Sequence, residues 1–242
     1  MANTYLFGAS GHGKVVKEIL NANGVEVEAF VDDNMAVNEC AGRPVLHDAT
    51  ALTPIIVSIG VNRIRKLVAE RLRAQAEAHH QPLSFATAIH PSAIVSPSAR
   101  IGEGSVVMAG AIINADVKIG KHCIVNTGAS IDHDCVIEDF CHIAPGAHIS
   151  GGTHVGEGTW IGVGASVIQC LRIGKDCMIG AGSVVVNNIP DGVTAFGNPC
   201  RVRNYNHQDS TMKKNVQTPS WGGKTVVFTP KSNEERRMRH AA

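Results

Sequence analysis

His133 lies between two carboxylates, in the segment Asp132-His133-Asp134-Cys135, and a histidine beside an acid is a candidate general base. The acid can orient the imidazole ring and stabilise the imidazolium cation that forms when the ring accepts a proton. A solvated histidine at a turn could have the same neighbours. The local sequence alone leaves both interpretations open.

A second cluster of residues suited to chemistry lies near the N-terminus. There a short apolar strand is followed by the turn Gly8-Ala9-Ser10-Gly11-His12-Gly13 and then by a helix. The backbone N–H groups and the helix dipole at such a turn can bind a phosphate. Asp32 and Asp33 end the next strand, where an acid often binds a ribose. The spacing G-x-x-G-x-G and the single short βαβ half disfavour NAD, and a tight turn without a ligand would need the same glycines.

The elements that position these residues follow from a six-residue repeat. Every sixth residue from Ile89 to Val185 is Ile or Val, without exception. This period is typical of a parallel β-helix, in which three short strands form a coil of roughly eighteen residues, so we expect about five to six coils. The residue two positions before each Ile or Val is nearly always small, which suits a narrow interior. Glycine often follows the Ile or Val, where we expect corners with unusual dihedral angles.

The same register places the cysteines. Four of the seven occupy the small inward position, where a thiol acts as a small hydrophobe: Cys123, Cys135, Cys141 and Cys177. The other three show no CxxC spacing. We therefore expect all seven to be reduced and structural, as in a cytosolic protein.

The register also separates the histidines that could bind a metal. His142, His148 and His154 each precede a core position, so they lie on three successive walls of one chain. Walls about a third of a turn apart cannot supply ligands to one ion. The sequence therefore predicts no metal site.

Composition argues against several classes of function. The chain has 242 residues and a formal net charge of +1 at pH 7, so nothing points to nucleic acid or to an anionic membrane. No apolar stretch is long enough to span a bilayer, and the first residues begin a strand and not a signal peptide. We expect a cytoplasmic protein with no membrane insertion.

The chain divides into three predicted parts. Residues 1–84 form a Rossmann-like α/β domain with strands at 4–7, 25–31 and 55–59, and with a helix that Asn62 caps and whose apolar face is Ile64, Leu67, Val68 and Leu72. Residues 85–203 form the all-β helix. Residues 204–242 form a basic, flexible tail in which 224–230 could make one strand.

Four segments carry a resemblance to a known family: residues 5–13, Val31-Asp32-Asp33, the sequence SIGVNRIR from Ser58, and residues 126–137. Residues 1–203 resemble the sugar O- and N-acetyltransferases of the left-handed β-helix superfamily. The bacterial UDP-4-amino-sugar N-acetyltransferases that make bacillosamine-type sugars look most similar, and the sialic acid O-acetyltransferases are near relatives.

The resemblance implies an acetyl-CoA-dependent enzyme that acetylates the C4 amine of a nucleotide-linked amino-deoxy sugar, with UDP as the expected nucleotide, for surface glycan biosynthesis. It also implies a homotrimer with acetyl-CoA in the groove between adjacent β-helices, and no metal. The nucleotide sugar would bind to Gly8, Ala9, Ser10, Gly11, His12, Gly13, Asp32, Asp33, Gly60, Val61 and Asn62.

In the family, the catalytic base matches His133, and Asp134 matches the assisting acid, which is Glu in many members. His142 and Asn126 match acetyl-CoA contacts. The backbone N–H that matches Gly151 can stabilise the oxyanion of the tetrahedral intermediate.

Other functions remain open from the sequence alone. An O-acetyltransferase for sialic acid or another sugar hydroxyl would carry the same motifs, and GDP or CMP could replace UDP. A non-catalytic trimer that binds nucleotide sugars would keep the glycine turn without using His133. A zinc hydratase of the β-helical carbonic anhydrase type would need a pair of histidines five apart, which the coils lack.

Overall fold

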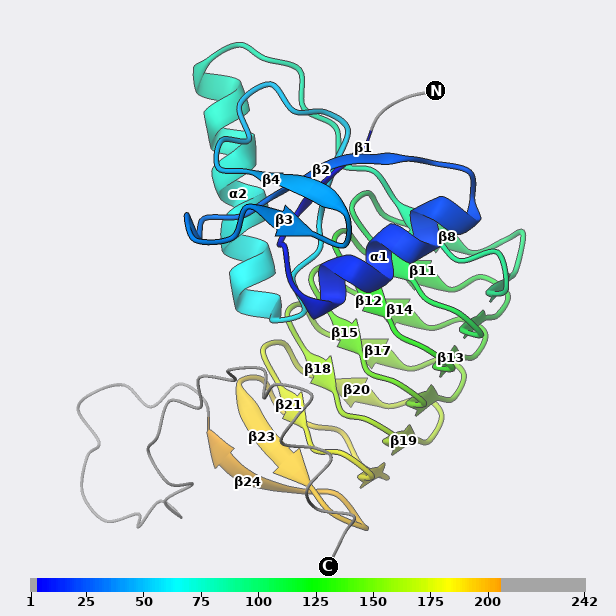
Figure 1. The fold of residues 1–242 in the computed structure, drawn as a ribbon. Coiled ribbons are helices and arrows are strands. Elements are labelled where there is room, and N and C mark those ends of the chain that lie inside the picture. Colours follow the sequence, from blue (N-terminus) through cyan, green and yellow to red (C-terminus); the bar gives the residue numbers. More distant parts are fainter. Residues whose placement is uncertain (1–3, 206–242) are drawn as a thin grey trace, which may run out of the picture. The chain divides into compact units, whose positions relative to one another are not determined.

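The computed structural model describes residues 4–205. Residues 4–84 form the expected Rossmann-like part, and the repeat forms the expected parallel β-helix (Figure 1). The predicted strand at 224–230 lies outside the described residues.

The Rossmann-like part is a five-stranded sheet in the order β3-β4-β2-β1-β5, with two helices packed against it. All strand pairs are parallel except β3 with β4. The hairpin of β3 and β4 was not predicted. The elements are β1 (Thr4–Phe7), α1 (Gly11–Ala22), β2 (Val27–Val31), β3 (Glu39–Cys40), β4 (Arg43–Leu46), β5 (Ile55–Val57) and α2 (Asn62–Ala78).

The second helix differs from the sequence prediction in two respects. The N-cap of α2 is Val61, and Asn62 is already the first helical residue. Ile64 and Leu67 are exposed, because the helix turns a different face inward. The buried face comprises Asn62, Arg65, Val68, Ala69 and Leu72. Arg65, a long charged side chain, thus lies on the buried face, which we expected to be apolar.

The β-helix has three walls of parallel two-residue strands, one strand of each coil per wall. The six-stranded wall contains β7 (Ile94–Val95), β10 (Ile112–Ile113), β13 (Ser130–Ile131), β16 (His148–Ile149), β19 (Ser166–Val167) and β22 (Val184–Val185). The five-stranded wall contains β8 (Arg100–Ile101), β11 (Lys118–Ile119), β14 (Val136–Ile137), β17 (His154–Val155) and β20 (Arg172–Ile173).

The eight-stranded wall includes two strands that break the repeat at its C-terminal end. It contains β6 (Ala88–Ile89), β9 (Val106–Val107), β12 (Ile124–Val125), β15 (His142–Ile143), β18 (Trp160–Ile161), β21 (Met178–Ile179), β23 (Val193–Phe196) and β24 (Arg201–Tyr205). β23 pairs with β21 in parallel, but β24 pairs with β23 antiparallel. Neither of these two strands was predicted from the sequence.

Every Ile and Val of the repeat is the second residue of its strand. From Val107 onward these side chains are at most 4% exposed, and together with the small inward residues they form one apolar core. The four predicted inward cysteines are in this core. Burial of this stack of branched side chains is the main stabilising contribution to the β-helix.

The glycines that follow the core positions are required for a different reason from the one expected. Gly102, Gly120 and Gly162 do not have positive φ angles. A Cβ at Gly162 would lie 2.5 Å from the Ile179 oxygen of the next coil, and one at Gly120 would lie 2.6 Å from the Asp139 nitrogen. Close approach of successive coils requires glycine there. The positive φ angles fall two residues later, at positions that include Gly104, Gly128 and Gly146 but also Asp116 and Asp134.

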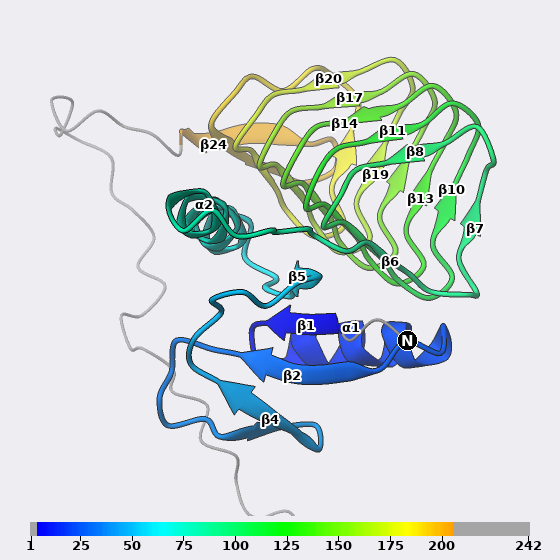
Figure 2. The same ribbon diagram turned by 90° about the horizontal axis from the view of Figure 1, so that it is seen from above.

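The Rossmann-like part packs against the outer face of the eight-stranded wall (Figure 2). Outward residues of that wall, Ala88, Val106 and Ile124, form one apolar cluster with residues of β1, α1 and β2. The six-stranded and five-stranded walls face away from it (Figure 2). This arrangement decides which predicted site residues can meet within one chain.

Neither helix within residues 4–205 has the length and apolar character that crossing a membrane requires.

Candidate active site

His133 follows β13 and lies at the corner between the six-stranded and the five-stranded wall. Its Nδ1–H donates to Asp134 Oδ2 at 2.7 Å, and its backbone N–H donates to Asp132 Oδ1 at 2.8 Å. The bond to Asp134 and the charge of Asp132 raise the pKa of His133 above its usual range. Because Asp134 holds Nδ1 and the side chain is 61% exposed, Nε2 is free to accept a proton from a ligand.

Gly151 lies directly against the His133 ring, one coil further along. A Cβ at Gly151 would stand 2.8 Å from the ring's Nε2 and Cε1, so the absence of a side chain makes room for the imidazole. The Gly151 carbonyl accepts a hydrogen bond from Cys170, but within residues 4–205 the Gly151 N–H donates none. A proton acceptor and an unused backbone donor thus lie side by side.

The glycine turn forms the expected connection between β1 and α1. Gly8 has φ +117°, and a Cβ at Gly13 would lie 2.2 Å from the Gly8 oxygen, so both positions require glycine. Gly11 begins α1 and is exposed. The Ser10 side chain makes no capping hydrogen bond, which leaves the first N–H groups of the helix without a side-chain cap. Such a helix start suits an anion.

His12 adds a further group to this turn. Its Nε2 is buried and has no hydrogen-bond partner among residues 4–205. Burial, reinforced by the charge of Arg65, lowers the pKa of His12 to about 4. The ring is therefore neutral at pH 7 and can donate or accept one hydrogen bond to a ligand.

The two aspartates are already engaged in the fold. Asp32 Oδ2 accepts the Ala9 N–H at 2.8 Å, and Oδ1 accepts the Asn34 N–H at 2.9 Å. Asp33 forms a two-pronged bond with Arg71 at 3.0 Å to each oxygen. Asp32 thus shapes the glycine turn, and a ribose contact from it remains a prediction.

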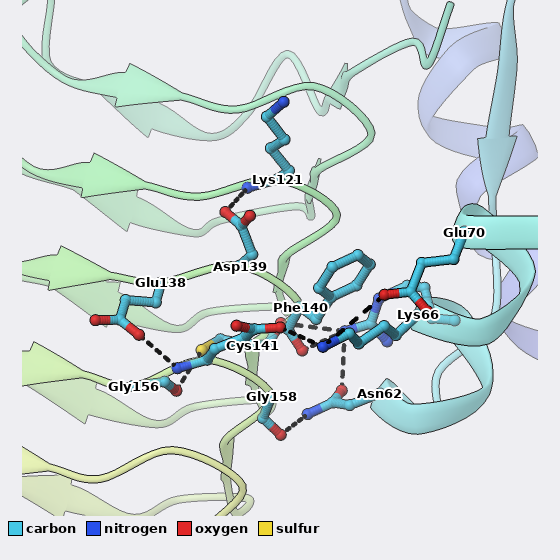
Figure 3. A network of polar contacts seen from close by, with 12 residues as sticks. Asn62, Lys66, Glu70, Lys121, Glu138, Asp139, Phe140, Cys141, Gly156 and Gly158 are labelled. Carbon is cyan, nitrogen blue, oxygen red and sulfur yellow. Dashed lines mark hydrogen bonds and ion pairs between the residues drawn. The ribbon is translucent and has the colours of Figure 1, made fainter. Parts of the chain in front are cut away.

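The second predicted nucleotide segment, Gly60 to Asn62, links β5 to α2 and touches the β-helix. Asn62 Nδ2 donates to the Gly158 oxygen at 2.9 Å (Figure 3), and Asn62 Oδ1 accepts from Arg65 Nη2 at 2.9 Å. Val61 is exposed. The Asn62 side chain therefore fastens the helix to the coils.

His142 and Asn126 meet on the outer face of the eight-stranded wall. His142 is 5% exposed, its Nδ1–H donates to the Gly60 oxygen at 3.2 Å, and its Nε2 lies 3.0 Å from Asn126 Nδ2. The Trp160 ring lies 4.3 Å from it, centroid to centroid. Burial, then the charge of Arg65, lowers the pKa of His142 to about 3.

The predicted residues thus form two groups within one chain. His133, Asp134 and Gly151 gather at one corner of the prism. The glycine turn, Gly60 to Asn62, His142 and Asn126 lie at the opposite side, where the Rossmann-like part covers the eight-stranded wall (Figure 2). The chain does not by itself bring the base to the nucleotide segments.

A cavity of about 570 Å³ opens beside the second group. Val61, Phe140, Trp160 and Met178 supply apolar lining, and Lys66 supplies a positive charge. Its size falls within the usual range for small-molecule sites.

Two residues of this region, Arg65 and Trp160, were not predicted from the sequence as site residues. The signal for Arg65 was its place at the start of an i, i+3, i+4, i+7 pattern with Val68, Ala69 and Leu72. Trp160 had none beyond its position before a core Ile.

No group of three His, Cys, Asp or Glu side chains within residues 4–205 is arranged to hold a metal ion. All seven cysteines are free, and only Cys170 among them is exposed.

Comparisons with known proteins agree with the fold. Residues 3–72 match the PglD N-terminal domain, and residues 98–133, 116–151 and 152–187 match the bacterial transferase hexapeptide family. UDP-N-acetylbacillosamine N-acetyltransferase of Bacillus subtilis is 44% identical over 119 residues, which are 45% of this chain and 52% of that protein. The chain thus spans about half the length of this curated relative.

Solved structures match over a longer range. A variant of perosamine N-acetyltransferase from Caulobacter crescentus, in complex with CoA and GDP-perosamine, is 42% identical, covers 84% of this chain and 98% of its own, and has a TM-score of 0.79. The acetyltransferase domain of PglB from Neisseria gonorrhoeae, in complex with acetyl coenzyme A, is 41% identical, with coverage of 84% and 100% and a TM-score of 0.76. The chain therefore belongs to the hexapeptide-repeat sugar N-acetyltransferases that carry a PglD-type N-terminal domain.

Proposed function

We propose that this chain transfers the acetyl group of acetyl-CoA to the C4 amine of a nucleotide-linked amino-deoxy sugar, with UDP as the expected nucleotide. The observation that carries the proposal is the His133 ring, held by Asp134 and lying against Gly151. The names of similar proteins include UDP-linked and GDP-linked amino sugars, and this supports the proposed substrate class.

The reaction needs one base and one oxyanion donor. The amine nitrogen attacks the thioester carbonyl carbon, and a proton passes from nitrogen to His133 Nε2. The Gly151 N–H stabilises the oxyanion that forms on the carbonyl oxygen. Collapse of the intermediate breaks the C–S bond, and the sulfur leaves as coenzyme A and takes up a proton. Asp134 keeps Nδ1 protonated, so that Nε2 is the accepting atom.

We further propose that the enzyme works as a homotrimer in which neighbouring copies complete each site. The support is the separation of the two groups of residues. His133 lies at the corner opposite the Rossmann-like part of its own chain, so a second copy would have to bring its nucleotide segments to that corner (Figure 2). The Rossmann-like part would hold the nucleotide sugar, and the groove between β-helices would hold acetyl-CoA.

The seven free cysteines support a cytoplasmic location, because a reducing compartment keeps thiols free. We also propose that the acetylated nucleotide sugar is used in the assembly of surface glycans.

A thiol-release assay with acetyl-CoA tests the function. Wild-type protein is incubated with UDP-, GDP- and CMP-linked amino sugars and with free sialic acid. We expect release of coenzyme A with a nucleotide-linked 4-amino sugar. The variant His133→Ala should lower turnover by about 10²–10⁴, because the amine then lacks its base.

The control is His80→Ala, which removes an exposed histidine beyond the end of α2 and should leave turnover unchanged. Near-normal turnover of His133→Ala would exclude His133 as the base. Thiol release with sialic acid but with no nucleotide-linked amino sugar would indicate O-acetylation instead of N-acetylation. Binding of a nucleotide sugar without thiol release would indicate a non-catalytic scaffold.

A further inference from the structure

Arg65 is a buried cation at the junction of the Rossmann-like part and the β-helix. It projects from α2 and is 1% exposed. Its Nε–H donates to the His122 oxygen at 2.7 Å, and Nη1 donates to the oxygens of Ile59 at 2.9 Å and Gly60 at 3.1 Å. Nη2 donates to Asn62 Oδ1 and to the Phe140 oxygen, each at 2.9 Å.

These acceptors belong to three separate segments. The Gly60 oxygen and the Asn62 amide belong to the predicted nucleotide segment, and Ile59 directly precedes it. The other acceptors are carbonyls at turns of two successive coils. None is a carboxylate. Only the planar fork of a guanidinium offers five N–H donors in fixed directions, so lysine could not bridge these segments at the same time. Burial lowers the pKa of Arg65 to about 10, which still leaves it charged at pH 7.

The Gly60 oxygen receives a second hydrogen bond, from His142. A carbonyl oxygen can only accept, so the His142 proton must be on Nδ1. Nε2 is then an acceptor, and the Asn126 amide can donate to it at 3.0 Å. The position of the Gly60 oxygen, which Arg65 holds, therefore determines the tautomer of His142.

The groups that face the His142 ring also keep it uncharged. Arg65 from α2 and His12 from α1 both disfavour a positive charge on the ring, and burial does so more strongly. Gly60 and Asn126 hold the two nitrogens, and Trp160 covers the ring. The ring is thus neutral and fixed in orientation.

We propose that Arg65 is a positioning residue, which holds the Gly60 to Asn62 segment in place for the nucleotide and, through the Gly60 oxygen, fixes the Nδ1–H tautomer of His142. Arg65 touches no reacting atom in this role. It links the segment predicted to bind the nucleotide to the residues predicted to contact acetyl-CoA. The proposal rests on the proposed function for the identity of the ligands.

The test compares Arg65→Met with Arg73→Met in the full-length protein. Arg73 is the matched control, because it also projects from α2 to the β-helix and bonds Glu103 at 3.0 Å, but it is half exposed. Calorimetry measures the affinity for UDP and for GDP, and ¹⁵N-labelled histidine reports the tautomer of His142 by NMR. We expect Arg65→Met to weaken nucleotide binding at least 10-fold and to mix the two His142 tautomers. Arg73→Met should change neither.

Unchanged affinity and an unchanged His142 tautomer in folded Arg65→Met would overturn the proposal. If Arg65→Met does not fold, Arg65→Lys replaces it, since lysine keeps the charge but loses the fork. The same two losses are expected for Arg65→Lys, and their absence would equally overturn the proposal. A wild-type protein that binds neither nucleotide contradicts the proposed function, whereas the His142 spectra still decide the role of Arg65.

Discussion

His133 and His142 have the same side chain and opposite electrostatic surroundings. His133 is exposed and bonded to a carboxylate, which raises its pKa, whereas His142 is buried beside Arg65, which helps lower its pKa to about 3. His133 is therefore accessible to a ligand and favours taking up a proton, whereas His142 stays neutral at pH 7. The division supports a base at position 133 and a hydrogen-bonding, uncharged group at position 142.

The pH dependence of the reaction follows from the Asp134 bond. The base must be neutral to accept a proton, and the raised pKa of His133 means that its neutral form is lost as the pH falls. Asp134→Asn removes the largest cause of that raise. We therefore expect the acid limb of the kcat/KM profile against pH to move to lower pH, with a lower plateau because the ring is less well oriented.

The control for this profile is Asp116→Asn. Asp116 stands one coil before Asp134 at the same corner and also has a positive φ, 58° against 59°. Its replacement should leave the acid limb in place. An unshifted limb in Asp134→Asn would show that another group, such as the substrate amine, sets the pH dependence.

At the scale of the elements, the coils of the β-helix were more predictable from the sequence than helix α2. The six-residue register placed the strands and the buried cysteines, because an inward position recurs at a fixed period whatever the surroundings. Helix α2 was less predictable: Arg65 is buried only because carbonyls from distant segments converge on it. The candidate base was recognisable from its acidic neighbours, but its contact with Gly151 depends on the stacking of coils.

The close approach of coils predicts where glycine is indispensable. In Gly162→Ala the Cβ would lie 2.5 Å from the Ile179 oxygen and 2.7 Å from the Ala181 nitrogen, both of them backbone atoms. We expect a loss of about 1–3 kcal/mol from overpacking, measured as a lower midpoint of urea unfolding.

The comparison for this variant is Gly128→Asn. Gly128 has φ +65°, and nothing lies within 4 Å of its Cβ position. Aspartates adopt the same conformation at positions 116 and 134, and asparagine tolerates it well. Gly128→Asn should therefore lose less stability than Gly162→Ala, and an equal loss would contradict the explanation by contact between coils.

At the scale of the whole molecule, the separation of His133 from the nucleotide segments predicts complementation between copies. Gly11→Glu places a negative charge at the start of α1, where the charge is compatible with the helix dipole but repels a phosphate. A Cβ at this position has no other atom within 4 Å, so the substitution should not disturb the fold. After random reassembly of Gly11→Glu with His133→Ala at equal amounts, about a quarter of all sites should be active, because at those sites one copy supplies an intact His133 and its neighbour an intact glycine turn.

The measurement is thiol release after the two variants are unfolded together and refolded at equal concentration. Each variant treated alone serves as the control and should remain inactive. No recovery in mixed oligomers of the expected mass would place the whole site in a single chain and exclude the proposed arrangement.

The reversal at β24 has a consequence for the length of the assembly. A stack of parallel coils has no built-in end, because its last coil offers the same pairing edge as every coil before it, and another molecule could add there to grow a filament. β24 runs antiparallel to β23, so the eight-stranded wall ends in a strand that the repeat cannot continue. Arg201 and Arg203 on this exposed strand also repel a second copy of it. We therefore expect β24 to oppose the addition of another copy at this end of the eight-stranded wall.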